Sequence, residues 1–386
     1  MTDDRERLLV VAGEASGDLH GARLIAELGG MVPGLRTFGL GGGEMRRAGC
    51  ETVADSAEIS VVGITEVLRV LSRAKQIFRA ILAEVDRRRP RAAVLIDFPE
   101  FNLRLARQLK RRGIPIVYYI SPQVWAWRRR RVKTIARRVD RMLVLFPFEV
   151  DVYRAAGLDA VHVGHPLVDE VPELPGAWDR PPEAGTPFRL ALLPGSRRSE
   201  VEALLPAMLG AVRLLAAELP VRTRLILAPS VPRALVEAAI EGSGQAVEIV
   251  AGDRFRAIAD SHLALCASGT ATLEVGLLAT PAIVVYRLEP WTYLLGRLLV
   301  RLPDISLVNL VLGRRVVPEL IQGEARPERI AAEARSLLAD PTAVSRMRRA
   351  EAELRGRLGE SGASRRAARE VASFLDGLSG RAGVAA

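Results

Sequence analysis

Short apolar runs recur along the first half of the chain, and segments with helical periodicity separate them. The runs occupy residues 8–12, 92–96, 114–120 and 142–146. A helical pattern follows the first run as far as about residue 28, and another covers 101–112. Continuous apolar runs are typical of strands buried on both faces. Strands that alternate with helices predict a parallel sheet with helices on both sides.

This rhythm breaks at residues 169–188, where five prolines and two glycines give the composition of a linker. Beyond it a helical pattern covers about 200–219. Strand-like runs return at 189–193, 225–228, 263–266 and 282–286. A strand, a glycine-containing loop and a helix therefore open each half of the chain.

These patterns predict an α/β protein of two doubly wound, Rossmann-like domains that face a cleft. The N-terminal domain is expected at 1–168, the linker at 169–188 and the C-terminal domain at 189–349. From residue 327 onward the pattern is helical and charged. The length of 386 residues agrees with two or three domains.

The composition indicates a reducing compartment and no membrane span. The two cysteines, Cys50 and Cys266, lie far apart and form no CxxC motif, which excludes a disulfide scaffold and a zinc ribbon. No stretch reaches about 18 uncharged apolar residues, and the N-terminus lacks the pattern of a signal peptide. We therefore expect a cytoplasmic protein or one attached peripherally to a membrane.

The net charge of +10 suggests anionic partners, although arginine supplies nearly all of it. The chain has only three lysines and no GK[ST], so an ordinary ATP-binding P-loop is absent. The absence of GxGxxG disfavours a dehydrogenase. The four histidines have no acid or cysteine at ligand spacing, and no Asp-x-Asp occurs. We therefore expect neither a metal nor a cofactor.

Ligands of open α/β sheets bind outside the carboxyl ends of the strands, so the loops after the predicted strands carry the candidate chemistry. The first loop spans 13–18 and leads into a helix. Its glycines permit close backbone approach, and a helix N-terminus attracts anions. The alternative is a simple tight turn between strand and helix. Glu14, Ser16 and Gly17 are the candidate substrate-binding residues here.

The second candidate loop begins with Asp97, directly after the apolar run 92–96. Phe98 and Phe101 would wall this carboxylate and partly desolvate it, which raises its pKa toward that of a useful general base. The alternative is helix capping by Asp97 or Asn102.

Two loops of the second half suit a phosphorylated ligand. Arg197 stands beside Gly195 and Ser196 at a predicted helix start, which is a natural phosphate clamp. Small polar residues at 268–270 precede another helix, and Glu274 follows one turn later, where it could accept hydrogen bonds from sugar hydroxyls. For Glu274 the alternative is a first-turn acid that the helix dipole favours.

A basic run at 128–141 follows a segment with two tryptophans, Trp125 and Trp127. Nucleic-acid binding is one interpretation. The aromatics precede the run instead of interleaving with it, and the spacing suits a helix with one apolar face, so a solvated helix face near anionic lipid is favoured. The basic amphipathic stretches 61–85 and 291–302 suit either a bilayer interface or packing into the core.

Seven segments occur in an order that resembles one known family. They are 11–18, 96–102, 121–128, 163–166, 192–197, 267–271 and 306–310. Together they resemble the lipid-A-disaccharide synthases, which are GT-B-type glycosyltransferases. Two positions depart from the family pattern, which often has Asp where Glu100 stands and Pro where Val308 stands.

The resemblance implies an inverting transfer of a sugar from UDP-2,3-diacylglucosamine to 2,3-diacylglucosamine 1-phosphate (lipid X). The products would be lipid A disaccharide 1-phosphate and UDP, formed without metal on the inner-membrane surface. Residues 61–82 match the family's membrane-facing patch. The last helices, about 350–378, are implied to return to the N-terminal domain. A homodimer is left open, and no nucleic-acid partner is expected.

The resemblance also assigns roles to residues. Asp97 would be the base that activates the acceptor 6-hydroxyl, and Arg197 with residues 268–270 would hold the UDP diphosphate. Glu274 would bind the ribose, and Asn309 would line the donor site. The complete set predicted to bind substrate is Glu14, Ser16, Gly17, Phe101, Asn102, Gln123, Gly195, Ser196, Arg197, Ser268, Gly269, Thr270, Glu274, Tyr286 and Asn309. The nearest alternative function is another UDP-sugar enzyme of the same architecture, such as a 2-epimerase, which needs no surface for acyl chains.

Overall fold

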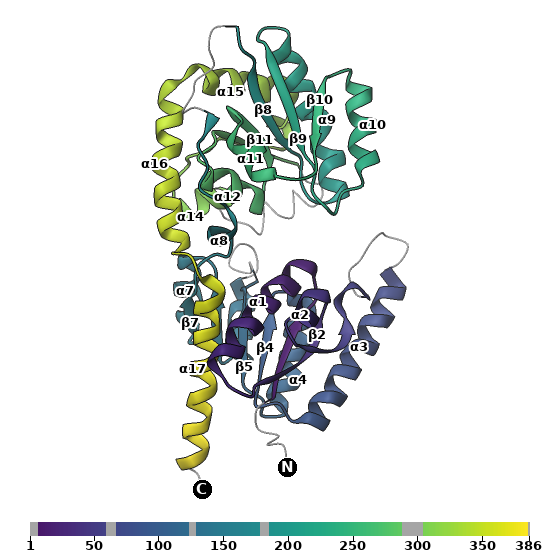
Figure 1. Cartoon of the computed structure of the whole chain (residues 1–386), viewed down its shortest axis with the longest axis vertical. Coiled ribbons are helices and arrows are strands. Elements are labelled where there is room, and N and C mark those ends of the chain that lie inside the picture. Colours follow the sequence, from purple (N-terminus) through teal and green to yellow (C-terminus); the bar gives the residue numbers. More distant parts are fainter. Residues whose placement is uncertain (1–6, 59–66, 123–128, 178–184, 288–303, 385–386) are drawn as a thin grey trace. The chain divides into compact units, whose positions relative to one another are not determined.

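The computed structural model describes residues 7–58, 67–122, 129–177, 185–287 and 304–384 (Figure 1). The chain forms two compact units. Unit 1 comprises Met1–Pro166 and Ser361–Ala386, and unit 2 comprises Leu167–Glu360. Each unit has a parallel sheet with helices on both faces, which confirms the predicted α/β, doubly wound class.

Unit 1 is built on a sheet of seven parallel strands. The strands are β1 (Arg7–Ala12), β2 (Arg36–Gly41), β3 (Glu51–Asp55), β4 (Ala92–Ile96), β5 (Ile116–Tyr119), β6 (Arg141–Val144) and β7 (Asp159–His162). The helices are α1 (Ala15–Met31), α2 (Gly43–Arg47), η2 (Ser56–Glu58), α3 (Val67–Arg88), α4 (Pro99–Arg111), α6 (Arg129–Ala136), α7 (Pro147–Arg154) and α17 (Ala363–Val384).

The strand order of unit 1 is β3-β2-β1-β4-β5-β6-β7. The chain moves outward from β1 to β3 and then returns to place β4 beside β1. The order therefore reverses between β1 and β4, and such a switch point opens a crevice for ligands at the carboxyl ends of the two strands.

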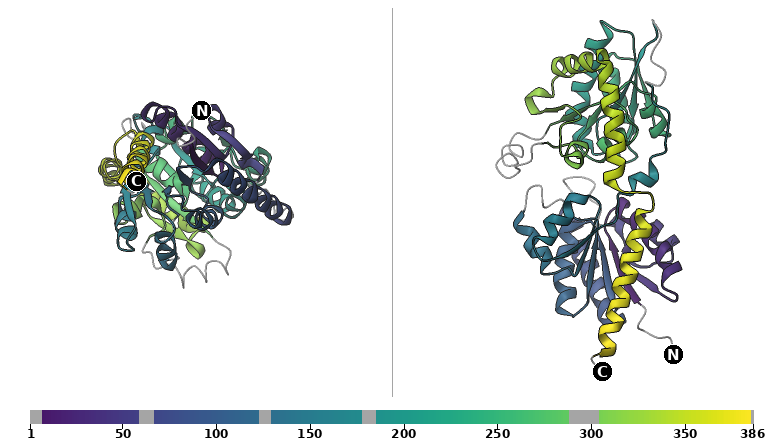
Figure 2. Two further views of the ribbon diagram at one scale, coloured as in Figure 1. Left: turned by 90° about the horizontal axis from the view of Figure 1, so that it is seen from below. Right: turned by 90° about the vertical axis from the view of Figure 1, so that its left-hand side faces the viewer.

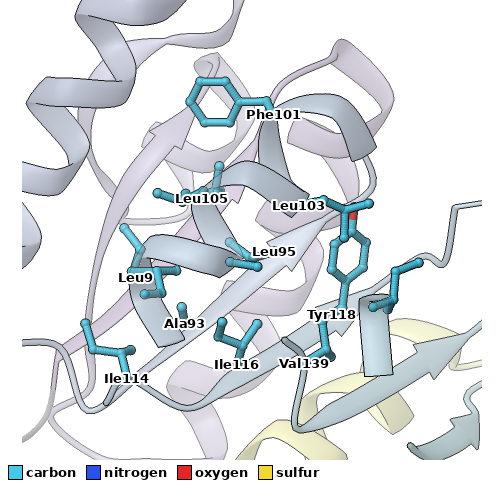
Figure 3. Close-up of a cluster of buried hydrophobic side chains, with 14 of the residues drawn as sticks. Leu9, Ala93, Leu95, Phe101, Leu103, Leu105, Ile114, Ile116, Tyr118 and Val139 are labelled. Carbon is cyan, nitrogen blue, oxygen red and sulfur yellow. The ribbon is translucent and has the colours of Figure 1, made fainter. Parts of the chain in front are cut away.

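Both faces of this sheet are buried, which explains the continuous apolar runs. Alternate residues of the central strands, among them Leu9, Leu95 and Tyr118, join α3, α4 and α6 in one core cluster. Figure 3 shows part of this cluster, with Leu9, Leu95, Phe101 and Tyr118 from different elements. On the other face α1 packs against β1, β4 and α17.

Unit 2 has a sheet of six parallel strands in the order β10-β9-β8-β11-β12-β13, so its switch point lies between β8 and β11. The strands are β8 (Phe188–Leu193), β9 (Val221–Ile226), β10 (Val247–Val250), β11 (Leu263–Ala267), β12 (Ala282–Tyr286) and β13 (Glu319–Ile321). The helices are α8 (Leu167–Glu170), α9 (Arg198–Ala216), α10 (Arg233–Ser243), α11 (Arg254–Ala259), α12 (Thr270–Leu277), α14 (Leu307–Leu312), η5 (Gln322–Glu324), α15 (Pro327–Ala339) and α16 (Pro341–Leu358).

The chain returns to unit 1 at Ser361, which is later than the predicted position of about residue 350. The sequence placed residues from about 350 with the N-terminal domain, but α16 packs against α12 and α14 of unit 2. Gly276 explains this packing, because a Cβ there would lie 2.9 Å from the Leu354 side chain. Only α17 returns to unit 1, where it packs against α1. In Figure 2, α16 is the yellow-green helix and α17 the yellow one.

Two basic amphipathic segments pack into the core of unit 1. In α6, Val132 and Ile135 are buried, as the predicted apolar face requires. In α3, Ile77 and Ile81 are buried, so the C-terminal part of the stretch 61–82 serves the core instead of a membrane surface. The side chains of 59–71 lie outside the described residues, and so do residues 288–303, which contain the whole of the other stretch, 291–302. No helix in the described parts of the chain is long and apolar enough to cross a membrane.

Candidate functional site

The two predicted loops of unit 1 meet at its switch point. The last residues of β1 and β4, Ala12 and Ile96, are partners in the parallel ladder, so the loop at 13–14 and the turn at 97–98 leave the sheet side by side. A Cβ on Gly13 would lie 2.1 Å from Cδ1 of Phe98. Glycine at this position therefore lets the Phe98 ring cover the first loop.

Asp97 and Phe98 both adopt left-handed backbone conformations, with φ of 45° and 47°. Two consecutive non-glycine residues in this region are costly unless their surroundings hold them. The carbonyl oxygen of Asp97 accepts hydrogen bonds from the Tyr118 hydroxyl at 2.5 Å and from Nδ2 of Asn102 at 2.8 Å. Nδ2 of Asn102 also donates to the carbonyl of Ile96 at 3.1 Å. Tyr118 and Asn102 therefore brace the turn that presents Asp97.

The carboxyl group of Asp97 is half-buried, and its pKa is raised to about 6. Burial is the main cause, because it penalises the charged form, and the negative charge of Glu14 adds to it. The backbone N–H of Phe98 opposes the rise by favouring the carboxylate. A carboxylate with this pKa is ionised at neutral pH and basic enough to accept a proton from a hydroxyl group in a reaction.

Neither capping alternative is seen at this turn. Phe98 is the N-cap of α4, and no side chain caps that helix. Asn102 is fully buried, and its amide group serves the backbone of the turn. Phe101 is also buried, with its ring stacked on Phe98 at 5.5 Å and edge-on to Phe78 at the same distance. Phe101 and Asn102 thus support Asp97 from behind.

The first loop contains both exposed and structural residues. Glu14 and Ser16 are exposed, whereas Gly17 is buried, and a Cβ there would lie 3.3 Å from Cβ of Ala12. The buried Asp18 accepts hydrogen bonds from three amides at the start of α2, those of residues 42, 44 and 45, at 2.6–3.1 Å. Glu14 and Ser16 therefore remain as the loop's candidate ligand contacts.

The segment after β5 is anchored by a buried carboxylate. The Ser121 hydroxyl donates to Oε1 of Glu149 at 2.6 Å, and the Tyr153 hydroxyl donates to Ser121 at 3.3 Å and to the Pro122 carbonyl at 3.3 Å. Glu149 also accepts from the backbone N–H of Phe146. Gln123, which the sequence predicted to bind substrate, lies outside the described residues.

In unit 2 the corresponding loops again leave adjacent strands, because Leu193 of β8 pairs with Cys266 of β11. The loop after β8, residues 194–197, is called the Gly195 loop. Gly195 has φ of 118°, and a Cβ there would lie 2.5 Å from Oε2 of Glu200. The side chain of Arg197 is 78% exposed and pairs with Oε1 of Glu200 at 2.9 Å.

The loop after β11 is hydrogen-bonded to the segment before α14. The Ser268 hydroxyl donates to the carbonyl of Ile305 at 2.9 Å. Gly269 has φ of 142°, a conformation that favours glycine, and a Cβ there would meet no atom within 4 Å. Thr270 is exposed at the first position of α12. The Ser268 hydroxyl is therefore occupied by a hydrogen bond within unit 2, whereas the Thr270 side chain is accessible.

Glu274 lies one turn into α12 with only 14% of its side chain exposed. Burial raises its pKa, and Arg254 opposes the rise through an ion pair at 3.3 Å. Tyr286, at the end of β12, feels the charges of Glu200 and Arg197, although burial is the main cause of its raised pKa. Tyr286 is therefore brought close to the Gly195 loop.

The side chain of Asn309 bonds to its own unit, whereas the family resemblance implied that it would line the donor site. It is buried, and its Nδ2 donates to the carbonyl of Val317 at 2.9 Å and to Oε1 of Glu319 at 2.8 Å. Its Oδ1 accepts from the amides of Val316 and Val317 at 2.7 and 3.1 Å. A side-chain amide has two donor hydrogens and two acceptor lone pairs, so these bonds saturate it. Asn309 fixes the chain between α14 and β13, and a ligand would have to displace one of these bonds.

Three residues of these sites were not singled out from the sequence. Tyr118 lies within an apolar run, where nothing marks its hydroxyl as a partner of Asp97. Glu200 stands three residues after the N-cap of α9. An acid at this position commonly forms a capping box, so the spacing is a sequence signal that could have identified Glu200. Arg254 is distant in sequence from Glu274, so only the fold reveals their pairing. Across the described residues, no group of three His, Cys, Asp or Glu side chains could hold a metal ion.

Comparisons of the whole sequence extend the similarity over nearly its full length. A family model described as lipid-A-disaccharide synthetase matches residues 8–372. The lipid-A-disaccharide synthase of Myxococcus xanthus is 47% identical over 381 residues, which cover 96% of this chain and 97% of the relative. The lipid-A-disaccharide synthase of Anaeromyxobacter sp. (strain K) is 45% identical over 375 residues, which cover 96% and 98% of the two chains.

Solved structures are similar in fold at much lower identity. Acinetobacter baumannii MurG matches with a TM-score of 0.58 at 14% identity, over 96% of this chain and 99% of its own. A putative UDP-N-acetylglucosamine 2-epimerase from Listeria monocytogenes matches with a TM-score of 0.63 at 12% identity, over 93% and 94% of the two chains. These matches confirm the GT-B-type fold class. Because the matching structures include the calicheamicin glycosyltransferase CalG4 as well as a putative 2-epimerase, the fold alone does not separate the two enzyme classes that the sequence suggested.

Proposed function

Because the chain belongs to the lipid-A-disaccharide synthetase family, we propose that it joins UDP-2,3-diacylglucosamine to 2,3-diacylglucosamine 1-phosphate. In this reaction the 6-hydroxyl oxygen of the acceptor attacks C1 of the donor sugar. The bond from C1 to the diphosphate oxygen breaks, UDP leaves, and the hydroxyl proton passes to a base. The product is the β-1,6-linked disaccharide 1-phosphate.

Asp97 is proposed as that base, and its environment is the observation that carries the proposal. The carboxylate stands at the β1/β4 switch point, on a turn that Tyr118 and Asn102 brace. Its pKa of about 6 keeps it ionised at neutral pH but makes it more basic than an ordinary aspartate. Glu14, exposed beside it, is the second acid available to bind sugar hydroxyls of the acceptor.

The donor's diphosphate is proposed to bind at the switch point of unit 2. The guanidinium of Arg197 is exposed there, and a planar guanidinium can bind phosphate oxygens in pairs. The N-terminus of α12 at Gly269 and Thr270 adds backbone N–H groups and a favourable helix dipole. These groups would stabilise the negative charge that develops on UDP as it leaves.

Glu274 and Tyr286 are proposed to complete the donor site. Glu274 is held by Arg254 and can accept hydrogen bonds from the ribose hydroxyls. Tyr286, at the end of β12, lies near enough to the Gly195 loop for the charges of Glu200 and Arg197 to affect its pKa. Asn309 and Ser268 enter this proposal as residues that shape the site, because their side chains bond to the fold.

The decisive experiment measures UDP release by the purified protein with both lipid substrates. We expect wild type to release UDP only when lipid X is present, and Asp97→Asn to lose this activity by at least about 100-fold, as removal of a general base commonly does. Asp86→Asn is the matched control, because Asp86 is an exposed acid that pairs with Arg112. No release by wild type would disprove the reaction, and an active Asp97→Asn would disprove the base.

Peripheral membrane association is the further part of the proposal, because both substrates carry acyl chains. Leu68 and Leu71 are the candidate membrane residues, and their side chains lie outside the described residues. Glutamine at both positions is expected to reduce co-sedimentation with anionic phospholipid vesicles, whereas glutamine at Lys75 would test the contribution of charge. Unchanged sedimentation of the Leu68/Leu71 variant would contradict this part. Light scattering of the purified protein would decide whether it is a homodimer.

A further inference from the structure

We infer that Glu200 is a positioning residue of the donor site, which fixes the Gly195 loop and orients the guanidinium of Arg197 toward the diphosphate of UDP. The inference rests on the proposed function of that loop. It goes further by assigning a role to an acid, whose charge would by itself repel a diphosphate.

One carboxylate collects three donors of the loop. Oε2 of Glu200 accepts from the backbone N–H groups of Ser196 at 3.0 Å and Arg197 at 3.2 Å. Oε1 accepts from NH1 of Arg197 at 2.9 Å. From the other side, the Ser230 hydroxyl donates to the carbonyl of Ser196 at 2.6 Å. The loop backbone is therefore held at two points, and the arginine side chain is attached to the same anchor.

This arrangement could also suggest that Glu200 merely occupies the diphosphate position until UDP replaces it. The packing of Gly195 argues against that alternative. A Cβ on Gly195 would lie 2.7 Å from Cβ of Glu200, so the loop is wrapped around the base of the side chain as well as its carboxylate. Displacement of the carboxylate by UDP would also break the bonds from the Ser196 and Arg197 amides that hold the loop.

The exposure of the two side chains points the same way. Glu200 is only 24% exposed, whereas Arg197 is 78% exposed. The carboxylate is thus the anchored partner and the guanidinium the accessible one. A guanidinium has five N–H donors, and within the described residues the only hydrogen bond of this side chain goes from NH1 to Glu200. The remaining N–H groups can donate to two phosphate oxygens. The ion pair with Glu200 restricts the rotamers of Arg197, so less conformational entropy is lost when the guanidinium binds them.

The test compares the affinities of UDP and uridine by calorimetry in wild type, Glu200→Gln and Glu200→Ala. Glutamine can still accept from the loop amides but cannot form the ion pair, so it isolates the orientation of Arg197. We expect Glu200→Gln to weaken UDP binding about tenfold and Glu200→Ala to weaken it further, since loss of a charged partner commonly has effects of this size. Uridine lacks the diphosphate, and its affinity should change less than twofold.

Glu202→Gln is the matched control, because Glu202, two residues after Glu200 on α9, pairs with Arg198 and both side chains are exposed. It should bind UDP as wild type does. A double-mutant cycle then separates positioning from general structural support. If Glu200 acts through Arg197, Glu200→Gln should have little further effect on UDP binding once Arg197→Ala is present.

The outcomes distinguish this inference from the proposed function. Wild type that fails to bind UDP would contradict the proposed donor site and the inference together. Wild type that binds UDP while Glu200→Gln binds it equally well would overturn only the inference. Tighter binding by Glu200→Gln would also overturn it and would show that the acid stands in for the diphosphate. If the two substitutions change the free energy of UDP binding additively, Glu200 supports the loop without acting through Arg197, and the inference is overturned.

Discussion

Ionised Asp97 should destabilise unit 1, so Asp97→Asn is expected to be more stable than wild type at neutral and alkaline pH. Asparagine resembles the protonated carboxyl group in shape and charge, and its side-chain oxygen can still accept the N–H of Phe98. The variant therefore removes the buried charge and its repulsion by Glu14, the two causes of the raised pKa. The same substitution is proposed to abolish catalysis, so stability and activity should change in opposite directions.

The size and pH dependence follow from linkage. The pKa rises from 3.8 to about 6 on folding, so the folded state binds this proton more tightly than the unfolded chain. The penalty is absent below about pH 4, develops as the pH rises to about 6, and is complete above it. A difference of this size corresponds to about 3 kcal/mol, which is an upper limit because solvent reaches the half-buried carboxylate.

Amide hydrogen exchange of β4 and β5 is the appropriate assay, because these central strands report the opening of unit 1 independently of unit 2. At pH 8 their amides should exchange between about tenfold and 100-fold more slowly in Asp97→Asn than in wild type, since 1.4 kcal/mol is a factor of ten. At pH 4 the two proteins should exchange alike. Asp86→Asn is the control: Arg112 lowers the pKa of Asp86, so its removal should not stabilise the fold.

Exchange in Asp97→Asn at pH 8 that is as fast as in wild type would refute the claim that the carboxylate is held in an unfavourable environment. A stabilisation that persists unchanged at pH 4 would show that asparagine improves packing, and would refute the electrostatic cause. In wild type the same pKa predicts that kcat/KM falls below about pH 6 as Asp97 takes up a proton.

Three further substitutions test the surroundings of the two sites. Tyr118→Phe removes one of the two hydrogen bonds to the Asp97 carbonyl and should lower kcat about tenfold with the donor KM unchanged; an unaltered kcat in steady-state assays would contradict the bracing role. Gly195→Ala places a Cβ 2.5 Å from Oε2 of Glu200 at φ of 118° and should weaken UDP binding at least about tenfold, so a wild-type titration would count against the loop geometry. Asp18→Asn replaces an acceptor of three amides and should cost about 1–3 kcal/mol in urea unfolding, which an unchanged midpoint would disprove.

The central strands of both sheets could be predicted because burial on both faces leaves continuous apolar runs. β1, β4, β8 and β12 lie within one residue of the predicted bounds. The strands that the pattern missed have other constraints. β2 contains Gly39, where a Cβ would lie 1.9 Å from the carbonyl oxygen of Val10, so close approach of two strands requires a residue that normally indicates a break. β3, β7, β10 and β13 lie at sheet edges. Most residues of β3, β7 and β10 are half-buried or exposed, and β13 has only three residues, so none of these strands leaves a continuous buried run.

Residue types at the sites could be predicted, but their partners could not. The family resemblance assigned Asn102 and Asn309 to the set of substrate-binding residues. The structure shows that both amides bond to backbone carbonyls inside their own units. Conversely, Tyr118 and Glu200 gain their importance only from neighbours that the fold supplies. Hydrogen-bond partners depend on distances of a few tenths of an ångström, and a one-dimensional pattern carries no such information.

The two switch points show how one strand order supports opposite electrostatics. In unit 1 the loops after β1 and β4 bring together Glu14 and Asp97, and burial, with repulsion by Glu14 added to it, raises the pKa of Asp97 as a base requires. In unit 2 the equivalent loop after β8 presents Arg197, and the acid beside it anchors the arginine instead of repelling a second carboxylate. Proton removal needs a carboxylate that binds a proton readily, whereas departure of UDP needs fixed positive charge. The chemistry at each switch point therefore depends on side chains in the loops, and the sheets supply only their positions.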